Sequence, residues 1–231
     1  MLPAKPRNLD PLAVELLEGL APCPSAQSIV LGGYFALKHY HDYRGSHDVD
    51  AWWSDASNAR QREETRRALH KVLTELGARH GLELCARRFG DTESWELRRA
   101  GRSVFSFQIS ARTLQLEPPL PSPWPPLQIE TLADNVGAKM NALVQRGAPR
   151  DFLDLHELVR TGLVTPADCW RLWQRKNPDL ALAAARAEVT RHLAALEKRR
   201  PLAGILDASQ RDRAASVRTW FHDRFLTCTS P

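Results

Sequence analysis

The fold is decided by two neighbouring segments, IVLGGYFAL (residues 29–37) and RGSHDVDAW (residues 44–52). The first is a short apolar run that ends at Gly32 and Gly33 and continues into a helix-like segment. In the second, Asp48 and Asp50 alternate along another apolar run. Because successive side chains of a strand point to opposite faces, these two carboxylates are expected to share one face of a sheet.

Two carboxylates on one face repel each other unless a cation lies between them. Hard oxygen ligands favour Mg²⁺ or Mn²⁺, so Asp48 and Asp50 are candidate metal ligands. Gly32 and Gly33 lack side chains at a turn where the backbone can closely approach another group, such as a triphosphate. The ordinary alternatives are solvated carboxylates on an edge strand and a plain strand-to-helix turn.

A second polar block comes later, in LADNVGAKMNALVQR (residues 132–146) and RDFLDL (residues 150–155). Apolar spacing predicts a helix over residues 131–146, with Lys139 beside its apolar stripe and Arg146 two turns further on the same face. Asp151 and Asp154 are three residues apart and share a face of the next helix. A snorkelling surface lysine and a helix-capping role for Asp151 are the ordinary alternatives.

The two blocks together resemble the AbiEii/AbiGii-type toxin family of bacterial abortive-infection and toxin–antitoxin systems, which has the nucleotidyltransferase fold. The first family motif reads roughly Gly-Gly-x-x-Ala-Leu, a spacer, and Arg-x-Ser-x-Asp-(Ile/Val)-Asp. The second is a helix with a Lys, an Ala-Leu and an Arg, followed by Arg-Asp-x-x-Asp. The resemblance covers about residues 25–165. Many nucleotidyltransferases have Ser where this chain has Tyr34, so a backbone N–H or Ser46 is expected to contact phosphate instead.

The resemblance implies a metal-dependent transferase that moves a nucleoside monophosphate from an NTP to an RNA (tRNA) 3′ end or to a protein hydroxyl. It also implies a toxin that a separately encoded antitoxin protein neutralises. Asp48 and Asp50 are expected to hold Mg²⁺ or Mn²⁺. The expected catalytic residues are Asp48, Asp50, Lys139 and Asp154. The expected nucleotide-binding residues are Gly32, Gly33, Arg44, Ser46, Lys139, Arg146, Arg150 and Asp151.

The chain departs from the usual nucleotidyltransferase pattern at the third carboxylate, which a later strand normally supplies. The expected strand 103–110 contains no Asp or Glu, and Gln108 occupies that place. Glutamine is neutral and cannot accept a proton. Glu96 and Asp154 are possible substitutes. The alternative hypothesis is therefore a catalytically impaired nucleotidyltransferase-fold module that binds RNA or a partner protein.

The composition is that of an ordinary globular protein. The 231 residues are 43% hydrophobic and 26% charged, with a net charge of +5, and the basic excess is compatible with an RNA or nucleotide partner. No apolar run approaches the roughly 20 residues of a membrane helix. The first residues lack the features of a signal peptide, so we expect a cytoplasmic location without membrane association. The four scattered cysteines predict free thiols.

The pattern of elements predicts an α+β fold. We expect a small mixed β-sheet flanked by helices, nucleotidyltransferase-like, over residues 1–127. An all-helical C-terminal region over residues 128–231 is expected to complete the active-site cleft. The expected strands are 28–31, 47–53, 82–88, 94–99 and 103–110, with 118–126 as an ordered, proline-rich connection. The expected helices are 9–20, 35–40, 58–77, 131–146, 151–161, one beginning at 165, 179–198 and 209–226.

Overall fold

The computed structural model describes residues 1–111 and 114–228. The chain folds as two compact units, Met1–Asn135 and Val136–Pro231. The division lies inside helix α4 (Leu132–Gln145), eight residues beyond the expected boundary between residues 127 and 128. The first unit contains the whole sheet, and the described part of the second unit contains helices and loops.

The sheet of the first unit has seven strands in the order β3-β4-β5-β2-β1-β7-β6. It is mixed, because β1 pairs antiparallel with β2 but parallel with β7, and β2 pairs parallel with β5. The expected α+β class is therefore confirmed. The strands are β1 (Ile29–Gly32), β2 (Asp48–Trp53), β3 (Glu83–Phe89), β4 (Thr92–Arg99), β5 (Arg102–Ser110), β6 (Leu120–Pro121) and β7 (Gln128–Ile129).

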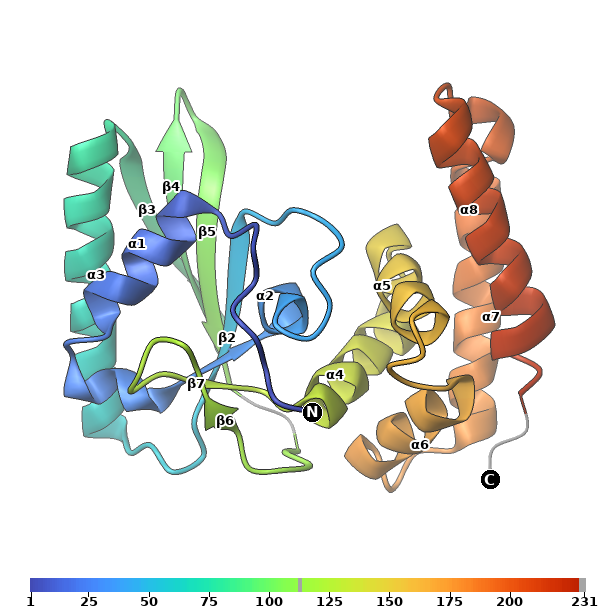
Figure 1. Ribbon diagram of the computed structural model, residues 1–231, viewed down its shortest axis with the longest axis horizontal. Helices are drawn as coiled ribbons and strands as arrows, with labels where there is room; N and C mark the ends of the chain where they lie inside the picture. The colour runs from blue at the N-terminus through green and yellow to red at the C-terminus, as the bar shows by residue number, and fades with distance from the viewer. Residues whose placement is uncertain (112–113, 229–231) are drawn as a thin grey trace. The chain divides into compact units, whose positions relative to one another are not determined.

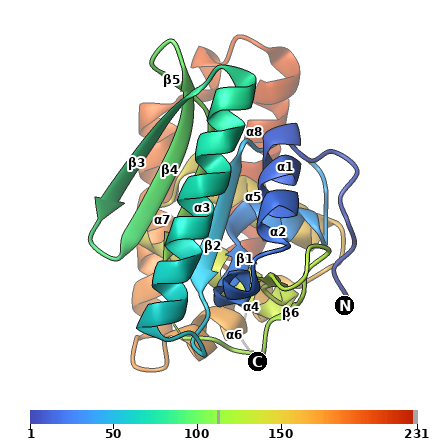
Figure 2. The ribbon, with the colours of Figure 1, turned by 90° about the vertical axis from the view of Figure 1, so that its left-hand side faces the viewer.

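One face of this sheet is apolar and is covered by α1 (Pro11–Leu20) and α3 (Ala59–His80), which lie side by side in Figure 2. In β2, Val49, Ala51 and Trp53 point into this core, and each is at most 3% exposed. The intervening residues Asp48 and Asp50 therefore lie on the opposite face, as the alternation predicts. The helix α2 (Gly33–Lys38) leads from β1 toward β2.

The long helix α3 does not end at Gly77, as its sequence suggested, but continues to His80. Its end is set by Gly81, which has φ +63° and donates its backbone N–H to the Gly77 carbonyl. This left-handed residue after the last turn is the usual helix terminator. Gly77 has a packing role instead, because a Cβ at that position would lie 2.9 Å from the Leu82 carbonyl oxygen.

The proline-rich connection 118–126 packs on the first unit as an ordered segment. It contains β6, and Trp124 is only 4% exposed, with its ring centroid 6.2 Å from that of Phe35. The expectation of an ordered connection is confirmed.

The second unit is helical (Figure 1), but the region expected to be all-helical, 128–231, begins with strand β7, which belongs to the sheet of the first unit. Its core is aromatic: the rings of Phe152 and Phe221 lie 4.8 Å apart, and Trp170 donates its indole N–H to the Phe225 carbonyl at 3.1 Å. No described helix is both long enough and apolar enough to cross a membrane. After α4 come α5 (Pro149–Arg160), α6 (Pro166–Lys176), α7 (Leu182–Arg199), α8 (Ala208–Trp220) and a π-helical turn, η3 (Phe221–Phe225).

Candidate active site

The two carboxylates of the first motif lie on the polar face of the central strands. Asp50 is the register partner of Gly32 on β1 and of Gln108 on β5, so these three residues form a row across the sheet. Neighbouring strands are about 4.8 Å apart, which places the backbone of each within reach of the next. Asp48 is exposed and Asp50 is half-buried. The face is therefore accessible to a ligand at these residues.

The glycine pair gives the backbone a close approach to two side chains of β2. Gly33 has φ +57°, and a Cβ there would collide with the carboxylate of Asp50. A Cβ on Gly32 would collide with the indole nitrogen of Trp52. The sequence predicted a close approach at this turn, and the structure shows that protein groups already occupy part of that space.

The buried side-chain amide of Asn135 binds the backbone of the glycine turn. Asn135 donates from Nδ2 to the Gly33 carbonyl at 2.7 Å and to Glu130 Oε2 at 3.1 Å. Tyr40 donates its hydroxyl to the Glu130 carbonyl at 2.7 Å, and burial, together with the Glu130 carboxylate, raises the pKa of this tyrosine. Sequence reasoning missed Glu130 and Asn135, because only the parallel pairing of β7 with β1 brings them to Gly33.

The loop between α2 and β2 is fastened through Tyr34. The Tyr34 hydroxyl accepts from the Arg44 backbone N–H at 2.8 Å and donates to the Arg44 carbonyl at 2.9 Å. The guanidinium carbon of Arg44 lies 3.4 Å from the centre of the Tyr34 ring. Ser46 Oγ accepts from the Asp48 N–H at 3.2 Å, which places this hydroxyl at the start of β2. Tyr34 thus fixes the approach to the carboxylate strand.

The structure places no third acid beside Asp48 and Asp50 among the described residues. Ser106 donates to Asp48 Oδ1 at 2.7 Å, and Gln108 beside Asp50 is exposed and neutral. Glu96 pairs with Ser106 one strand further away, and Arg98 binds its carboxylate at 2.6 Å and 2.8 Å.

Within residues 1–111 and 114–228, no cluster of three or more His, Cys, Asp or Glu side chains could hold a metal ion. Two hard carboxylates nevertheless fit Mg²⁺, which often takes only one or two protein carboxylates, together with substrate phosphates and water.

In the helical unit, Lys139 is bound to Asp154. Lys139 Nζ lies 2.6 Å from Asp154 Oδ2. Asp154 is fully buried and Lys139 is 8% exposed, so this lysine is not a snorkelling surface residue. The pair fixes the ammonium group of Lys139 on α4 against α5.

A second ion pair lies one turn away, at the start of α5. Arg146 donates to both oxygens of the buried Asp151, at 2.9 Å and 3.0 Å. Asp151 also accepts from the Ala148 backbone N–H at 3.2 Å, so it caps α5 as well. The side chain of Arg146 remains 52% exposed, and Arg150 is exposed. These arginines present positive charge to solvent, whereas both carboxylates are buried.

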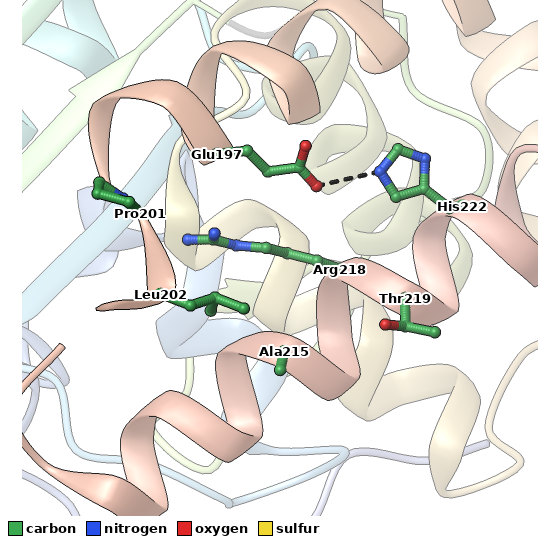
Figure 3. A pocket seen from close by; sticks show the side chains of 7 residues that line it. All are labelled: Glu197, Pro201, Leu202, Ala215, Arg218, Thr219 and His222. Carbon is green, nitrogen blue, oxygen red and sulfur yellow. Dashed lines mark hydrogen bonds and ion pairs between the residues drawn. The ribbon is translucent and has the colours of Figure 1, made fainter. Parts of the chain in front are cut away.

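The helical unit also contains a hollow of about 370 Å³ that no sequence motif indicated (Figure 3). His222 Nε2 lies 3.1 Å from Glu197 Oε1 across it, and Arg218 donates to the Arg200 carbonyl at 2.6 Å. None of the expected site residues lines this hollow. It is therefore separate from the residues that the motifs identify.

Comparison with known proteins gives the chain a family. A model described as "Nucleotidyl transferase AbiEii toxin, Type IV TA system" matches residues 15–222, which include both motif blocks. No curated protein matches the chain. A crystal structure of an H. pylori protein described as a candidate nucleotidyltransferase is 17% identical, covers 93% of each chain and gives a TM-score of 0.47. With most of its length matched, the chain belongs to the AbiEii nucleotidyltransferase toxins of type IV toxin–antitoxin systems.

Proposed function

We propose that this chain uses a divalent metal to transfer a nucleoside monophosphate from an NTP to the 3′ end of an RNA such as tRNA. The observation that carries the proposal is the pair Asp48 and Asp50 on one accessible sheet face, beside the turn at Gly33. Such transfer needs little covalent help from a protein. It depends on positioning the substrates and on stabilising the charge that develops on phosphate.

Asp48 and Asp50 are assigned as ligands of Mg²⁺ or Mn²⁺. The metal would neutralise charge on the phosphates and orient the acceptor hydroxyl. Ser106 fixes one oxygen of Asp48 through its 2.7 Å hydrogen bond. The side-chain-free backbone of Gly33 leaves room for the Asp50 carboxylate. These contacts would hold both ligands in place before substrate binds.

The nucleotide-binding roles are assigned to the glycine turn and to the basic residues. Gly32 and Gly33 would face the triphosphate, with Arg44 and Ser46 beside the carboxylate strand. Lys139 would bind the outer phosphates, with its ammonium oriented by Asp154. Arg146, oriented by Asp151, and Arg150 would add positive charge for the same ligand. A charged, pre-oriented donor favours phosphate more than a mobile one does.

The test is incubation of the purified protein with each α-³²P-labelled NTP, Mg²⁺ and total tRNA. Asp48→Asn keeps the size of the side chain but removes its charge, and the exposed Asp55→Asn is the matched control. Wild type and Asp55→Asn should label RNA, and Asp48→Asn should lose at least about 100-fold in rate, as should wild type with EDTA.

Label on protein instead of RNA would change the acceptor to a protein hydroxyl. No label with any nucleotide from a folded protein would overturn the proposal. That result would favour a module that binds RNA or a partner protein. Because NTPs and tRNA are cytoplasmic, the proposed reaction takes place in the cytoplasm, where the family also implies a cognate antitoxin as partner. Suppression of the labelling by the purified product of an adjacent antitoxin gene would test that partner.

A further inference from the structure

A second hollow in the first unit lies at the opposite end of β1 and β2 from the carboxylates. Its volume is about 260 Å³. Ser28 directly precedes β1 and Ser54 directly follows β2, whereas Gly32 and Asp48 lie at the other ends of these strands. Four residues of strand separate the two ends, which corresponds to roughly 13 Å. This hollow is therefore distinct from the proposed metal site.

The lining of the hollow is polar but uncharged. Its hydrogen-bonding side chains are those of Gln27, Ser28, Ser54, Ser57, Gln61 and Gln128. Ser28 is only 1% exposed, and its hydroxyl has no hydrogen-bond partner among the described residues. A buried hydroxyl without a partner is costly, so proteins rarely retain one unless a ligand or water completes it.

The rim of the hollow is braced before any ligand binds. Ser57 donates its backbone N–H to the Ser54 carbonyl at 3.0 Å, and Arg62 donates from Nε to Ser57 Oγ at 2.8 Å. Asn58 and Gln61 form a reciprocal capping box at the start of α3, with both distances 2.9 Å. The rim is pre-organised, which reduces the conformational entropy that a ligand must overcome.

The chemistry of the lining selects a neutral ligand with donors and acceptors side by side. No Asp, Glu, Lys or Arg is among the described residues that line the hollow, and the guanidinium of Arg62 at its rim already donates to Ser57 Oγ and to the Ser54 carbonyl. The amide of a glutamine presents one acceptor and one donor together, which is the pattern that pairs with the edge of a nucleobase. The free hydroxyl of Ser28 adds a third adaptable contact at the buried end.

We propose that this hollow binds a nucleobase by its edge, at a site separate from the Asp48–Asp50 face. The base is that of a free nucleoside or of a nucleotide within RNA, since both present the same edge. The proposal does not depend on the transferase reaction, because it requires neither a phosphate nor a metal.

The test is NMR titration of the full-length ¹⁵N-labelled protein with adenosine, cytidine, guanosine and uridine, without metal. These nucleosides carry no phosphate. We expect saturable shifts of the side-chain NH₂ signals of Gln27 and Gln128 with at least one of them. Ser28→Val replaces the buried hydroxyl with methyl groups and should raise the dissociation constant at least tenfold, whereas Asp48→Asn should leave it unchanged. The proposed transferase could therefore fail while this site is confirmed, or the reverse.

The source of the base and the state of Ser28 need two further measurements. Tighter binding of a short single-stranded RNA than of the nucleoside, lost in Ser28→Val, would assign the base to RNA, and equal binding would assign it to the free nucleoside.

Ser28→Ala should keep or raise the melting temperature because the Ser28 hydroxyl has no partner among the described residues. The buried control Ser122→Ala should lower it, because Ser122 Oγ accepts from the Trp124 N–H at 3.1 Å.

Three results would overturn the proposal. The first is the absence of saturable shifts with all four nucleosides. The second is binding that Ser28→Val leaves unchanged, which would place the nucleoside elsewhere. The third is equal shifts with ribose, which would make the hollow a polyol site. A lower melting temperature for Ser28→Ala would contradict the structural argument on which the ligand was inferred.

Discussion

The replacement Gly33→Ala tests whether the backbone at the glycine turn positions Asp50. Gly33 has φ +57°, and an added Cβ would collide with the Asp50 carboxylate. Gly81→Ala is the matched control, because Gly81 has φ +63° but no described atom within 4 Å of the position a Cβ would take. Both glycines belong to the first unit, so the same unfolding transition reports on both variants.

The expected losses of unfolding free energy in Gly33→Ala and Gly81→Ala differ only by the collision of the added Cβ with Asp50. A non-glycine residue in the left-handed region costs about 1–2 kcal/mol, and Gly81→Ala should lose about that much. Overpacking a filled site costs about 1–3 kcal/mol more, so Gly33→Ala should lose about 2–5 kcal/mol in all. Because Asp50 must move to admit the methyl group, the rate of nucleotidyl transfer should fall about 100-fold, as misplaced catalytic groups commonly cause.

The assay combines urea unfolding followed by circular dichroism with initial rates of RNA labelling at saturating Mg²⁺. Gly81→Ala should lose stability and keep its rate. The reasoning would be refuted by equal losses of stability in the two variants, together with a Gly33→Ala protein that labels RNA at the wild-type rate. That outcome would mean that Asp50 has room to move without consequence for the reaction.

Three other predictions concern Tyr34, Asp151 and His39. Tyr34→Phe removes both hydroxyl bonds to the Arg44 backbone, so the melting temperature should fall and kcat/KM for the NTP should fall about tenfold. Steady-state kinetics would show the second effect, and an unchanged kcat/KM would argue against a positioning role. Asp151→Ala removes a buried acceptor of Arg146 and a helix cap, so urea unfolding should show the helical unit less stable by about 2–3 kcal/mol. Burial lowers the pKa of His39 to about 4. The unfolded chain therefore binds this proton first, and stability should fall by up to about 3 kcal/mol as pH drops from 6.5 to 4. His39→Phe should flatten this slope in urea titrations at several pH values, and an unchanged slope would assign the dependence to other groups.

Local pattern was sufficient to predict β2 and its two faces. The alternation of Asp48 and Asp50 with Val49 and Ala51 specifies both the strand and which side is buried, because the side-chain period of a strand is fixed. The glycine turn was also predictable from local sequence, because few residues other than glycine adopt a left-handed conformation. The predicted C-terminus of α3 at Gly77 was wrong. A glycine inside a helix resembles a helix terminator in the sequence until its packing, here against Leu82, is known.

Contacts between distant segments could not be predicted in this way. Asn135 lies 102 positions after Gly33, and no periodicity in either segment shows that β7 pairs parallel with β1. The ion pair between Lys139 and Asp154 follows from how α4 and α5 pack, which the helical spacing of each helix leaves open. The hollow at Ser28 arises from three chain segments that carry no recognisable motif. The sequence therefore indicated candidate site residues but not the partners that orient them.

The lack of a third carboxylate beside Asp48 and Asp50 among the described residues is consistent with a proposed site whose two negative charges are balanced by one divalent metal ion. Asp48 and Asp50 together carry two negative charges, which one divalent ion neutralises. Gln108 adds none, although it occupies the register position beside Asp50. Glu96 is further along the same row as Asp48, but Arg98 binds its carboxylate within β4. A third free carboxylate on this face would raise the repulsion that the ion has to overcome before substrate binds. Under the proposed function, the neutral Gln108 therefore favours a site built around one divalent ion, with the phosphates of the NTP and the basic residues supplying the remaining electrostatic contacts.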